Sequence, residues 1–353
     1  CEFDKLPLWN FINGTLELNT GKFREHSQDD LCSIQMPYAY DPGAKCPHWE
    51  RFIADVTNND PRSGEILQFI PGYALFTGCP HEKIFVLTGE GGNGKFRYTM
   101  MLRKLFGEKN TTNLTPQGMN EPFRAIFLKD SVINIAGEIK TSLENTEETL
   151  KAISSGEEIQ ACYKGQQFIM FKPRCKLLFS CNGQLTATDT SKGLARRLII
   201  VNFPCEFVDT PDPRNPLQKQ ADIHLMEKLE TELPGIFNWA YEGYKTLRTV
   251  GYFTETNEQT ELIENFREAS NPILVFYREW LEQNPAPEIS RKEVYQQYVA
   301  WCEETNNKPL SDNRFHPEFK MVAKKTHEYT EKSIRTPTGP RKIRFYQKIG
   351  SQM

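Results

Sequence analysis

The sequence predicts an α/β fold, because apolar runs alternate with helical segments through the middle of the chain. The runs lie at residues 84–87, 131–135, 176–179 and 198–201, and their apolar character indicates strands of a largely buried sheet. A glycine-rich segment follows the first run and precedes a helical segment, which supports the same fold class. At 353 residues the chain exceeds one ordinary domain, so we expect two or three.

Composition and charge exclude several classes of protein. With 38% hydrophobic and 25% charged residues the chain can bury sizeable cores, which excludes wholesale disorder. No apolar run approaches the roughly 18 residues that span a bilayer and no signal peptide opens the chain, so we expect a cytoplasmic protein. The net charge of −3 excludes a bulk polycation, although residues 320–353 carry nine Lys or Arg against two Glu. Because the chain opens at Cys1 without an initiator Met, we interpret it as the downstream part of a longer polypeptide.

The nine cysteines are scattered without a CxxC pair, which favours a reducing compartment over a disulfide scaffold. The tripeptide Cys-Pro-His occurs at residues 46–48 and again at 79–81, and the two copies could offer two thiolates and two imidazoles to zinc. Their inner spacing differs from that of common zinc motifs. We therefore expect ordinary turn and core positions there, and we assign no residue as a metal ligand.

We expect three regions along the chain: a preamble at 1–78, a domain of alternating strands and helices at 79–255, and a basic carboxyl-terminal domain at 256–353. The preamble is predicted to contain strands at 8–12 and 15–18 and helices at 49–56 and 64–74. The four prolines of residues 204–216 indicate a linker, and a helical stretch follows it to about residue 248.

The carboxyl-terminal domain combines helices with a basic hairpin. Its predicted helices span 271–284, 290–301 and 311–323, the second of them opened by a capping box at Ser290. A hairpin is predicted over 333–349. Three helices and a hairpin are the parts of a winged helix.

The most specific signal is the glycine-rich loop after the first apolar run. The loop comprises Gly89, Glu90, Gly91, Gly92, Asn93 and Gly94. Glycines permit the backbone dihedrals with which amides surround a phosphate, and the following helix N-terminus adds positive potential. Lys95, the next residue, can reach the β- and γ-phosphates. The segment therefore predicts a nucleotide site, with ATP and Mg²⁺ as the expected cofactors.

Two positions depart from the pattern that binds Mg²⁺. The residue after Lys95 is ordinarily Ser or Thr, whose hydroxyl ligates the metal, but here it is Phe96. Thr99 lies three residues further on, and we do not expect it to replace that hydroxyl. The second apolar strand leads to Glu138, which can polarise an attacking water, but Gly137 stands where an Asp usually holds Mg²⁺.

In this order the features resemble the superfamily-3 helicase region of phage and plasmid primase-helicases, which are relatives of the poxvirus-type primase-helicase. The motifs upstream of the loop are Asn13-Gly14-Thr15-Leu16-Glu17-Leu18, Thr20-Gly21, Tyr40-Asp41-Pro42, Cys46-Pro47 and Gly72-Tyr73. Those downstream are Leu150-Lys151-Ala152-Ile153-Ser154-Ser155-Gly156-Glu157, Phe179-Ser180-Cys181-Asn182, Gly193-Leu194-Ala195-Arg196-Arg197-Leu198 and Phe203-Pro204.

The resemblance implies a P-loop AAA+-like core with a helical preamble and a winged-helix-like carboxyl-terminal module. It also implies an ATP-dependent DNA helicase that assembles as a ring, commonly hexameric, and moves 3′→5′ along single-stranded or forked DNA. The family further implies a linked upstream primase or polymerase domain in a phage or mobile-element replication protein, acting in the cytoplasm of the host cell.

Three polar residues match the family's motifs after the second apolar strand. Asn182 ends an apolar strand and could orient water near the γ-phosphate, with an ordinary turn asparagine as the alternative. Arg196 and Arg197 fall in the segment that resembles the family's arginine finger, so one of them could stabilise transition-state charge on a neighbouring subunit's nucleotide. A solvated basic pair is the alternative for both.

Two segments are predicted to contact DNA. Within residues 161–168, Gly165 could form a hairpin tip that presents Tyr163 for base stacking and Lys164 for phosphate, although an ordinary surface hairpin has the same sequence character. A second basic surface is expected at the carboxyl-terminal hairpin, where a solvated basic tail is the alternative. Its residues are Arg335, Arg341, Lys342 and Arg344.

The sequence supports one principal function and two rivals. The first is an ATP-driven helicase or translocase. The second is a hydrolysis-poor ring that binds nucleotide and DNA and holds a linked primase-polymerase at the fork, which Phe96 and Gly137 favour. A small-molecule P-loop kinase is the third, and the motifs around Asn182 and Arg196 disfavour it.

Overall fold

The computed structural model of the chain describes residues 3–143, 145–187, 192–253, 257–283, 288–305, 309–324, 327–336 and 339–348. These residues form two compact units, of which the first extends to Phe266 and the second begins at Arg267. The boundaries expected from the sequence at 78/79 and 255/256 both fall inside the first unit. The preamble packs into the same core as the central sheet, because side chains from both form one apolar cluster.

A five-stranded sheet forms the centre of the first unit, which confirms the α/β class. The strands lie in the order β10-β4-β9-β6-β5 and every neighbouring pair is parallel. Their bounds are β4 Ile84–Thr88, β5 Thr111–Thr112, β6 Ile133–Ala136, β9 Lys176–Ser180 and β10 Leu198–Asn202. The four apolar runs of the sequence are therefore the four long strands. Because all strands are parallel, their carboxyl ends meet at one edge of the sheet.

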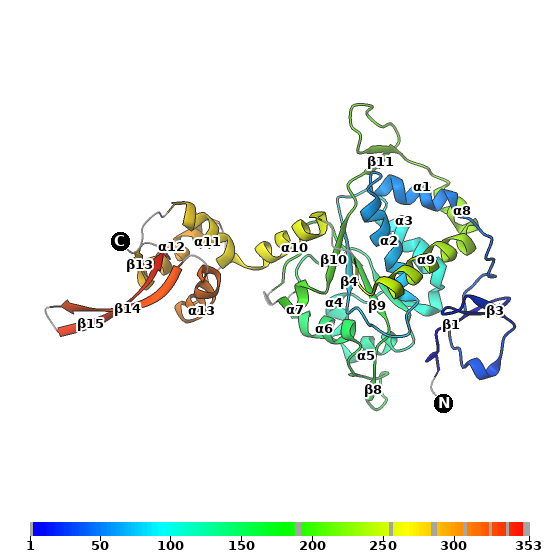
Figure 1. Cartoon of the computed structure of the whole chain (residues 1–353), viewed down its shortest axis with the longest axis horizontal. Helices are drawn as coiled ribbons and strands as arrows, with labels where there is room; N and C mark the ends of the chain where they lie inside the picture. Colours follow the sequence, from blue (N-terminus) through cyan, green and yellow to red (C-terminus); the bar gives the residue numbers. More distant parts are fainter. Residues whose placement is uncertain are drawn as a thin grey trace. The chain divides into compact units, whose positions relative to one another are not determined.

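Helices cover both faces of this sheet (Figure 1). Successive side chains along a strand alternate between faces, so Phe85 and Leu87 join one apolar cluster while Ile84 and Val86 join another. The first cluster includes residues from α1 Pro47–Val56, α2 Pro61–Ala74, α3 Lys95–Phe106, α8 Leu225–Thr231 and α9 Leu233–Val250. The second includes residues from α4 Pro116–Met119, α5 Pro122–Ala125, α6 Glu147–Ser155, α7 Lys192–Ala195 and α10 Asn257–Ser270.

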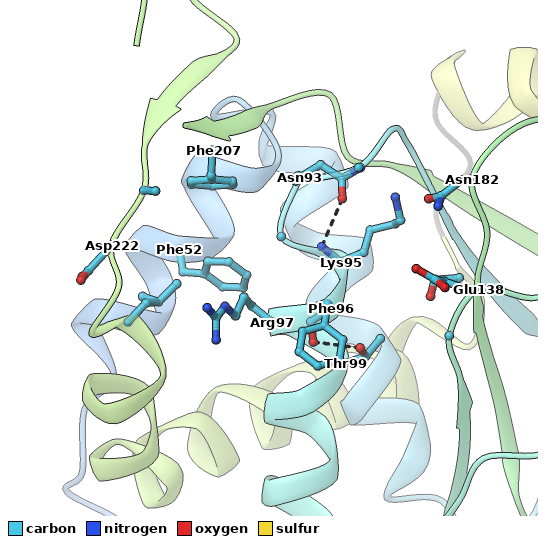
Figure 2. Close-up of a pocket in the computed structure, with 17 residues that line it drawn as sticks. Phe52, Asn93, Lys95, Phe96, Arg97, Thr99, Glu138, Asn182, Phe207 and Asp222 are labelled. Atoms are coloured by element: carbon cyan, nitrogen blue, oxygen red, sulfur yellow. Dashed lines mark hydrogen bonds between the residues drawn. The ribbon is translucent and has the colours of Figure 1, made fainter. Parts of the chain in front are cut away.

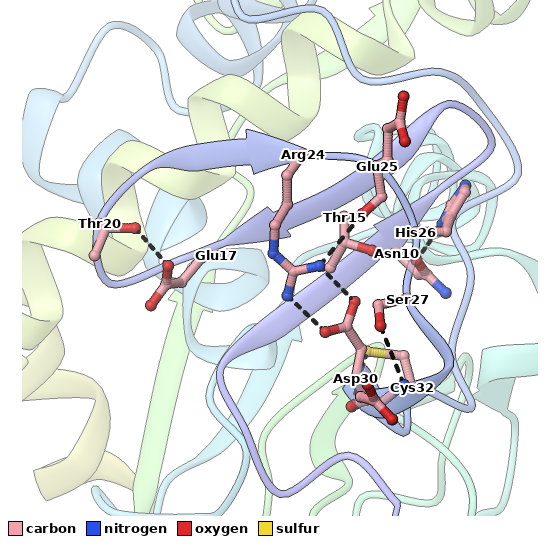
Figure 3. A network of polar contacts seen from close by, with 11 residues as sticks. Asn10, Thr15, Glu17, Thr20, Arg24, Glu25, His26, Ser27, Asp30 and Cys32 are labelled. Carbon is pink, nitrogen blue, oxygen red and sulfur yellow. Dashed lines mark hydrogen bonds and ion pairs between the residues drawn. The ribbon is translucent and has the colours of Figure 1, made fainter.

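The preamble begins with a small antiparallel sheet of β1 Leu8–Phe11, β2 Gly14–Glu17 and β3 Lys22–Arg24. A bidentate pair between Arg24 and Asp30 closes this sheet onto the following segment, with N–O distances of 2.9 and 2.5 Å (Figure 3). The hydrogen bonds from Arg24 lower the pKa of the Asp30 carboxyl. The predicted strand pair and both helices of the preamble are confirmed.

Residues 204–216, predicted as a linker, instead form part of a small folded excursion. The parallel strands β11 Glu206–Val208 and β12 Gln218–Gln220 pair within it. The backbone N–H of Phe207 donates to the carbonyl oxygen of Gly92 at 2.9 Å, which docks the excursion on the glycine-rich loop. The prolines therefore interrupt regular structure without making the segment a free connection.

The hairpin predicted from Gly165 is present in the first unit. Strands β7 Ile159–Ala161 and β8 Ile169–Phe171 pair antiparallel, and the backbone N–H of Gln166 donates to the carbonyl oxygen of Tyr163 across the tip. Gly165 adopts a φ of 81°, in the left-handed region that glycine tolerates best.

Within its described residues, the second unit contains three complete helices and a three-stranded sheet around its own apolar core. Its elements are α11 Pro272–Gln283, β13 Glu288–Ser290, α12 Arg291–Glu304, α13 Asp312–Ala323, β14 His327–Thr336 and β15 Gly339–Lys348. The predicted capping box is present, since Ser290 and Glu293 bond reciprocally at the start of α12. The hairpin is longer than predicted because β14 begins at His327, ahead of the expected residue 333.

The two Cys-Pro-His tripeptides take up separate structural positions. Cys46 is buried at the start of α1, and the Cys79 thiol lies 3.8 Å from the carbonyl oxygen of Pro173. Within the described ranges, no three His, Cys, Asp or Glu side chains are grouped as metal ligands would be. Among the described helices, none is both long enough and apolar enough to cross a membrane.

Candidate nucleotide site and nucleic-acid surfaces

The candidate nucleotide site lies at the carboxyl edge of the central sheet. The glycine-rich loop follows β4, Glu138 follows β6, and Asn182 follows β9, which lies between those two strands. Ligands of open parallel sheets bind at this edge, where neighbouring strands connect in opposite directions. Residues 91–96, Glu138 and Asn182 line one pocket of about 710 Å³ at this edge. The structure thus brings together the predicted catalytic residues of strands β4, β6 and β9.

Three glycines give the loop its conformation. Gly89, Gly92 and Gly94 have φ values of 135°, 74° and 92°, which side chains rarely adopt. A Cβ on Gly89 would lie 2.3 Å from the Asn93 amide nitrogen, and one on Gly94 would lie 2.7 Å from a methyl group of Val56. The loop is therefore packed tightly enough that glycine is required at these two positions.

Lys95 is held by the loop that precedes it. Its ammonium donates to the carbonyl oxygens of Gly89 at 2.6 Å and Glu90 at 3.1 Å, and its backbone N–H donates to Asn93 Oδ1 at 3.4 Å. Burial lowers the pKa of Lys95 below its ordinary value, and the nearby carboxylate of Glu138 opposes this shift. A buried ammonium that lines a pocket and bonds only to neutral carbonyls is well placed to exchange those bonds for an anionic phosphate.

The first turn of α3 offers no free hydroxyl where Mg²⁺ is ordinarily bound. Phe96 points its ring into the pocket and is 68% exposed. Thr99 also lines the pocket, but its hydroxyl donates to the backbone carbonyl of Phe96 at 3.0 Å (Figure 2). The expectation that Thr99 does not replace the missing hydroxyl agrees with this contact.

Glu138 and Asn182 lie on the side of the pocket that Lys95 faces (Figure 2). Glu138 is exposed and has a φ of 50°, a left-handed conformation that is uncommon for a residue other than glycine. Such local strain is concentrated at functional sites. Gly137, next to it, would place a Cβ 3.6 Å from the Ser180 hydroxyl, which is an ordinary contact, so a side chain fits there.

The opposite side of the pocket is lined mainly by apolar side chains, with Arg97 and Asp222 beside them, and none of its residues was predicted from the sequence. Phe52 of α1, Phe207 of the excursion and Leu225 of α8 line it, and Arg97 extends its guanidinium beside Phe52 (Figure 2). A Cβ on Gly94 would lie 3.3 and 3.4 Å from the Phe52 and Phe207 rings, so these rings meet at the end of the loop. No sequence pattern links these residues, because they come from three separate segments.

The two predicted arginines lie away from this pocket, at the amino-terminal edge of the same sheet. They directly precede β10, whose first residue, Leu198, pairs with Ile84 at the start of β4. Arg197 is buried and donates to the carbonyl oxygen of Gly193 and to the Ser155 hydroxyl, both at 2.8 Å. Arg196 is exposed. The structure therefore separates two residues that are equivalent in the sequence.

The β7–β8 hairpin carries the predicted DNA-contacting residues at its tip. Lys164 is exposed and Tyr163 is partly exposed, and the Tyr163 ring meets the exposed Phe127 ring edge-on at 6.3 Å between centroids. Phe168 and Met170 are also exposed on the hairpin. Phe127 was not predicted from the sequence, because it precedes the hairpin by more than thirty positions in the chain.

The carboxyl-terminal hairpin of the second unit carries the remaining predicted DNA contacts. Arg344 of β15 is exposed and lies 3.9 Å from the Glu331 carboxylate of β14. Arg335, Arg341 and Lys342 occupy backbone positions in this hairpin, but their side chains lie outside the described part of the structure.

Three family models match separate parts of the chain. Residues 2–58 match "D5 N terminal like", residues 87–197 match "Family of unknown function (DUF5906)", and residues 268–349 match "Poxvirus D5 protein-like". The chain is thus a relative of the D5-like primase-helicases, which confirms the resemblance stated from its motifs.

Two curated proteins match parts of the chain. The "Putative helicase L207/L206" of Acanthamoeba polyphaga mimivirus is 24% identical over 315 residues, which cover 83% of this chain and 33% of that protein. The "Uncharacterized mitochondrial protein ymf21" of Marchantia polymorpha is 24% identical over 136 residues, or 35% of this chain and 76% of that protein. This chain therefore spans about a third of the length of the mimivirus relative.

The apo structures of the NrS-1 C-terminal region share the fold. One has a TM-score of 0.55 at 13% identity and covers 97% of this chain and 95% of that chain. Another has a TM-score of 0.57 at 14% identity and covers 88% of this chain and 77% of that chain. At this identity the likeness concerns the fold alone. Together, the comparisons relate the chain to the D5-like primase-helicases and show that it shares its fold with the NrS-1 C-terminal region.

Proposed function

We propose that this chain is the ATP-dependent DNA helicase region of a phage or mobile-element replication protein, with a P-loop AAA+-like superfamily-3 core and a winged-helix-like carboxyl-terminal module. It acts as a ring, commonly hexameric, on single-stranded or forked DNA, and is linked to an upstream primase or polymerase domain. One observation carries the proposal: Lys95, Glu138 and Asn182 follow three neighbouring strands and line the same pocket, next to a glycine-rich loop.

The triphosphate binds between the loop amides and Lys95. The amides of the first turn of α3 and the ammonium together surround the β- and γ-phosphates. Lys95 gives up its bonds to the carbonyl oxygens of Gly89 and Glu90 and donates to phosphate oxygens instead. Glu138 polarises the attacking water, and Asn182 orients that water toward the γ-phosphate.

The base occupies the apolar side of the pocket. Phe52, Phe207 and Leu225 offer flat or aliphatic contact surface, while the Arg97 guanidinium offers donors to a ring nitrogen of adenine. The preamble and the excursion after β10 therefore both help to bind the nucleotide. This accounts for their packing against the loop.

The side chains of the pocket fit Mg²⁺ only in part. Phe96 and Gly137 supply no side-chain oxygen, and the Thr99 hydroxyl is bound to a backbone carbonyl. Among the described residues that line this side of the pocket, Glu138, Ser180 and Asn182 offer the remaining side-chain oxygens. Mg²⁺ tolerates such a site because it keeps several waters and binds phosphates directly. When bound, it neutralises charge that develops on the phosphates.

Arg196 supplies the arginine finger to the next subunit. Its guanidinium is exposed at the edge of the sheet opposite its own nucleotide pocket, so it can act only on a nucleotide held by another copy of the chain. Arg197 is unsuited to this role because its two terminal nitrogens are bound within the subunit. An arginine in trans requires an oligomer, which supports the ring.

Single-stranded DNA runs over the β7–β8 hairpin. Lys164 contacts phosphate, and Tyr163 with Phe127 offers adjacent aromatic surfaces for stacking bases without sequence preference. Arg335, Arg341, Lys342 and Arg344 of the carboxyl-terminal hairpin form a second phosphate-contacting surface.

A second function is favoured by Phe96 and Gly137. A hydrolysis-poor ring would bind nucleotide and DNA and hold the primase-polymerase at the fork without displacing a strand.

Displacement of a labelled strand from a forked duplex distinguishes the two functions, with Lys95→Met and Glu138→Gln as controls. The helicase displaces the strand with ATP from a fork with a 3′ tail, and both controls abolish displacement. Nucleotide-dependent fork binding without displacement would favour the scaffold.

A further inference from the structure

Glu82 and Lys83, the last two residues of the turn before β4, both contact the Arg196–Arg197 dipeptide through their side chains. The Glu82 carboxylate lies 2.7 Å from Arg197 Nη2 and 3.8 Å from Arg196 Nη2, through the same oxygen. Lys83 donates from its ammonium to the carbonyl oxygen of Arg196 at 2.7 Å. The backbone N–H of Ile84 donates to the carbonyl oxygen of Arg197 at 2.8 Å, where β4 and β10 begin to pair.

Glu82 adopts an unusual backbone conformation in this turn. Its φ is 52°, in the left-handed region, and its N–H donates to the carbonyl oxygen of Cys79 at 3.2 Å. A residue with a Cβ in this conformation is strained, so the surrounding contacts must hold it there. The contacts that do so are those with Arg196, Arg197 and the start of the sheet. Neither the motifs nor the resemblance assigned a role to Glu82.

The two arginines are held in different ways by the same carboxylate. Arg197 is fixed by Glu82, Gly193 and Ser155 together, so its side chain anchors the segment. Arg196 is 65% exposed, and its separation of 3.8 Å from Glu82 is an ion pair beyond hydrogen-bond distance. Among the hydrogen bonds of the described residues, none uses the Arg196 guanidinium. Its N–H groups are therefore available to a phosphate while the charge of Glu82 limits where the side chain points.

We propose that Glu82 is a positioning residue for Arg196, which it orients toward the nucleotide of the neighbouring subunit. The proposal rests on the proposed function, in which Arg196 acts in trans. An exposed arginine loses considerable side-chain entropy when it is held in one geometry, and misplacement on the order of 1 Å can cost about a hundredfold in rate. Glu82 restricts the Arg196 side chain before the nucleotide binds, because it pairs with Arg196 directly and also holds the neighbouring Arg197 in place. Less side-chain entropy is then lost when Arg196 contacts the nucleotide.

The test is a mixing experiment with Glu82→Gln in the full chain. The variant keeps the size of the side chain and an oxygen that can accept from Arg197, but it removes the charge that orients Arg196. We expect kcat for ATP to fall roughly tenfold while KM changes by less than about twofold, because the P-loop of the same subunit is intact. Glu242→Gln, which removes a charge that pairs with Lys245 on the exposed face of α9, is the matched control and leaves both constants unchanged.

Mixing Glu82→Gln with Glu138→Gln distinguishes positioning from a merely structural role. A Glu138→Gln subunit still offers an intact Glu82 and Arg196 to its neighbour, and a Glu82→Gln subunit still offers an intact nucleotide pocket. Mixed rings should therefore exceed the activity of either variant alone. If the mixture never exceeds its components, Glu82 acts on its own subunit, through β4 and the loop, and the proposal is wrong.

A parallel mixture of Arg196→Ala with Glu138→Gln separates this inference from the proposed function. If that mixture recovers activity and the Glu82 mixture does not, only the role of Glu82 fails. If neither recovers, action in trans fails as well.

If hydrolysis is too slow to follow, the rate at which a fluorescent nucleotide dissociates tests the same proposal. Dissociation of mant-ATP from the assembled protein should be faster in both Glu82→Gln and Arg196→Ala, because Arg196 contacts the γ-phosphate. Dissociation of mant-ADP should be unchanged in both variants. Faster release from Arg196→Ala with unchanged release from Glu82→Gln would overturn the proposal.

Discussion

The Thr99 hydroxyl donates to the backbone carbonyl of Phe96 at 3.0 Å, one turn into the helix that follows the glycine-rich loop. Serine and threonine hydroxyls commonly bond to the carbonyl one turn earlier in a helix, and a hydroxyl so engaged points along the helix surface. The pocket therefore has a threonine near the expected metal position without a hydroxyl directed at it. The Phe96 side chain, which follows Lys95, also lines the pocket and offers no oxygen ligand.

Restoring the missing oxygen ligands should raise ATP turnover. Phe96→Ser supplies the hydroxyl at the first turn of α3, and Gly137→Asp supplies a carboxylate beside Glu138. Both fit, because Phe96 is largely exposed and a Cβ on Gly137 meets only an ordinary contact with Ser180. We expect Phe96→Ser to increase kcat, with a further increase in the double variant, measured at equal protein concentration.

Phe96→Ala is the control for this prediction, since it removes the ring without adding a hydroxyl. If Phe96→Ala raises kcat as much as Phe96→Ser does, the increase comes from the space that the ring leaves. The added hydroxyl would then not act as a metal ligand.

Gly94→Ala should destabilise the loop, whereas Gly91→Ala should not. A Cβ on Gly94 meets Val56 at 2.7 Å and the residue has a φ of 92°, while a Cβ on Gly91 meets nothing within 4 Å. We expect Gly94→Ala to lower the free energy of unfolding by about 1–3 kcal/mol and Gly91→Ala to change it by less than about 0.5 kcal/mol. Urea denaturation of the nucleotide-free chain measures both. Equal values for the two variants would contradict the tight packing inferred for Gly94.

Lys164→Ala should weaken binding of single-stranded DNA and flatten its salt dependence. If Lys164 neutralises one phosphate, the slope of log K against log salt should fall by about 1, with nucleotide affinity nearly unchanged. Fluorescence anisotropy of a labelled oligonucleotide over a range of salt concentrations measures the slope. Lys45→Ala, at an exposed position of the preamble, is the control. An unchanged slope would remove Lys164 from the DNA contacts.

Lys176 should make the stability depend on pH in the alkaline range. Its ammonium is buried and donates to the carbonyl oxygens of Phe76 at 2.6 Å and Arg174 at 2.8 Å, and burial lowers its pKa to about 8. The unfolded chain therefore binds the proton more tightly than the folded chain. The charged form costs stability below about pH 8, and this cost disappears as the pH rises from about 8 toward the ordinary lysine pKa of about 10.4.

Comparison with Lys176→Met isolates this contribution from other titrating groups. The wild-type chain should gain stability relative to the variant as the pH rises through that window, measured by urea denaturation at several pH values. The variant leaves two carbonyl oxygens without their donor, so a constant offset between the chains is expected and the slope is the informative quantity. A difference that does not change with pH would contradict the lowered pKa.

Elements with a strong local signal were predictable from the sequence. The four long strands of the central sheet are continuous apolar runs, because a parallel sheet covered on both faces buries every side chain. The loop and Lys95 were predictable from the spacing of the glycines between an apolar strand and a helical segment. In contrast, α10 was missed because its sequence, from Asn257 to Ser270, is acidic and has few apolar residues.

The structure adds what depends on tertiary packing. Phe52 and Phe207 meet at Gly94 although 155 positions separate them, and no local pattern anticipates such a contact. Arg196 and Arg197 are adjacent and chemically identical, so the sequence left their roles open. Both lie in the turn before β10, where packing against Gly193, Ser155 and Glu82 buries Arg197 and leaves Arg196 exposed.

ATP turnover with and without single-stranded DNA tests the central claim most directly, with Lys95→Met as the background. The account predicts that the chain binds ATP, that it hydrolyses ATP slowly, and that DNA increases the rate, because the pocket and the hairpin belong to one coupled unit. If the chain hydrolyses ATP no faster than Lys95→Met, with or without DNA, the helicase function is contradicted. The hydrolysis-poor scaffold would then be the remaining proposal. Turnover of roughly tens per second, an ordinary rate for phosphoryl transfer, would instead show that Phe96 does not impair the site.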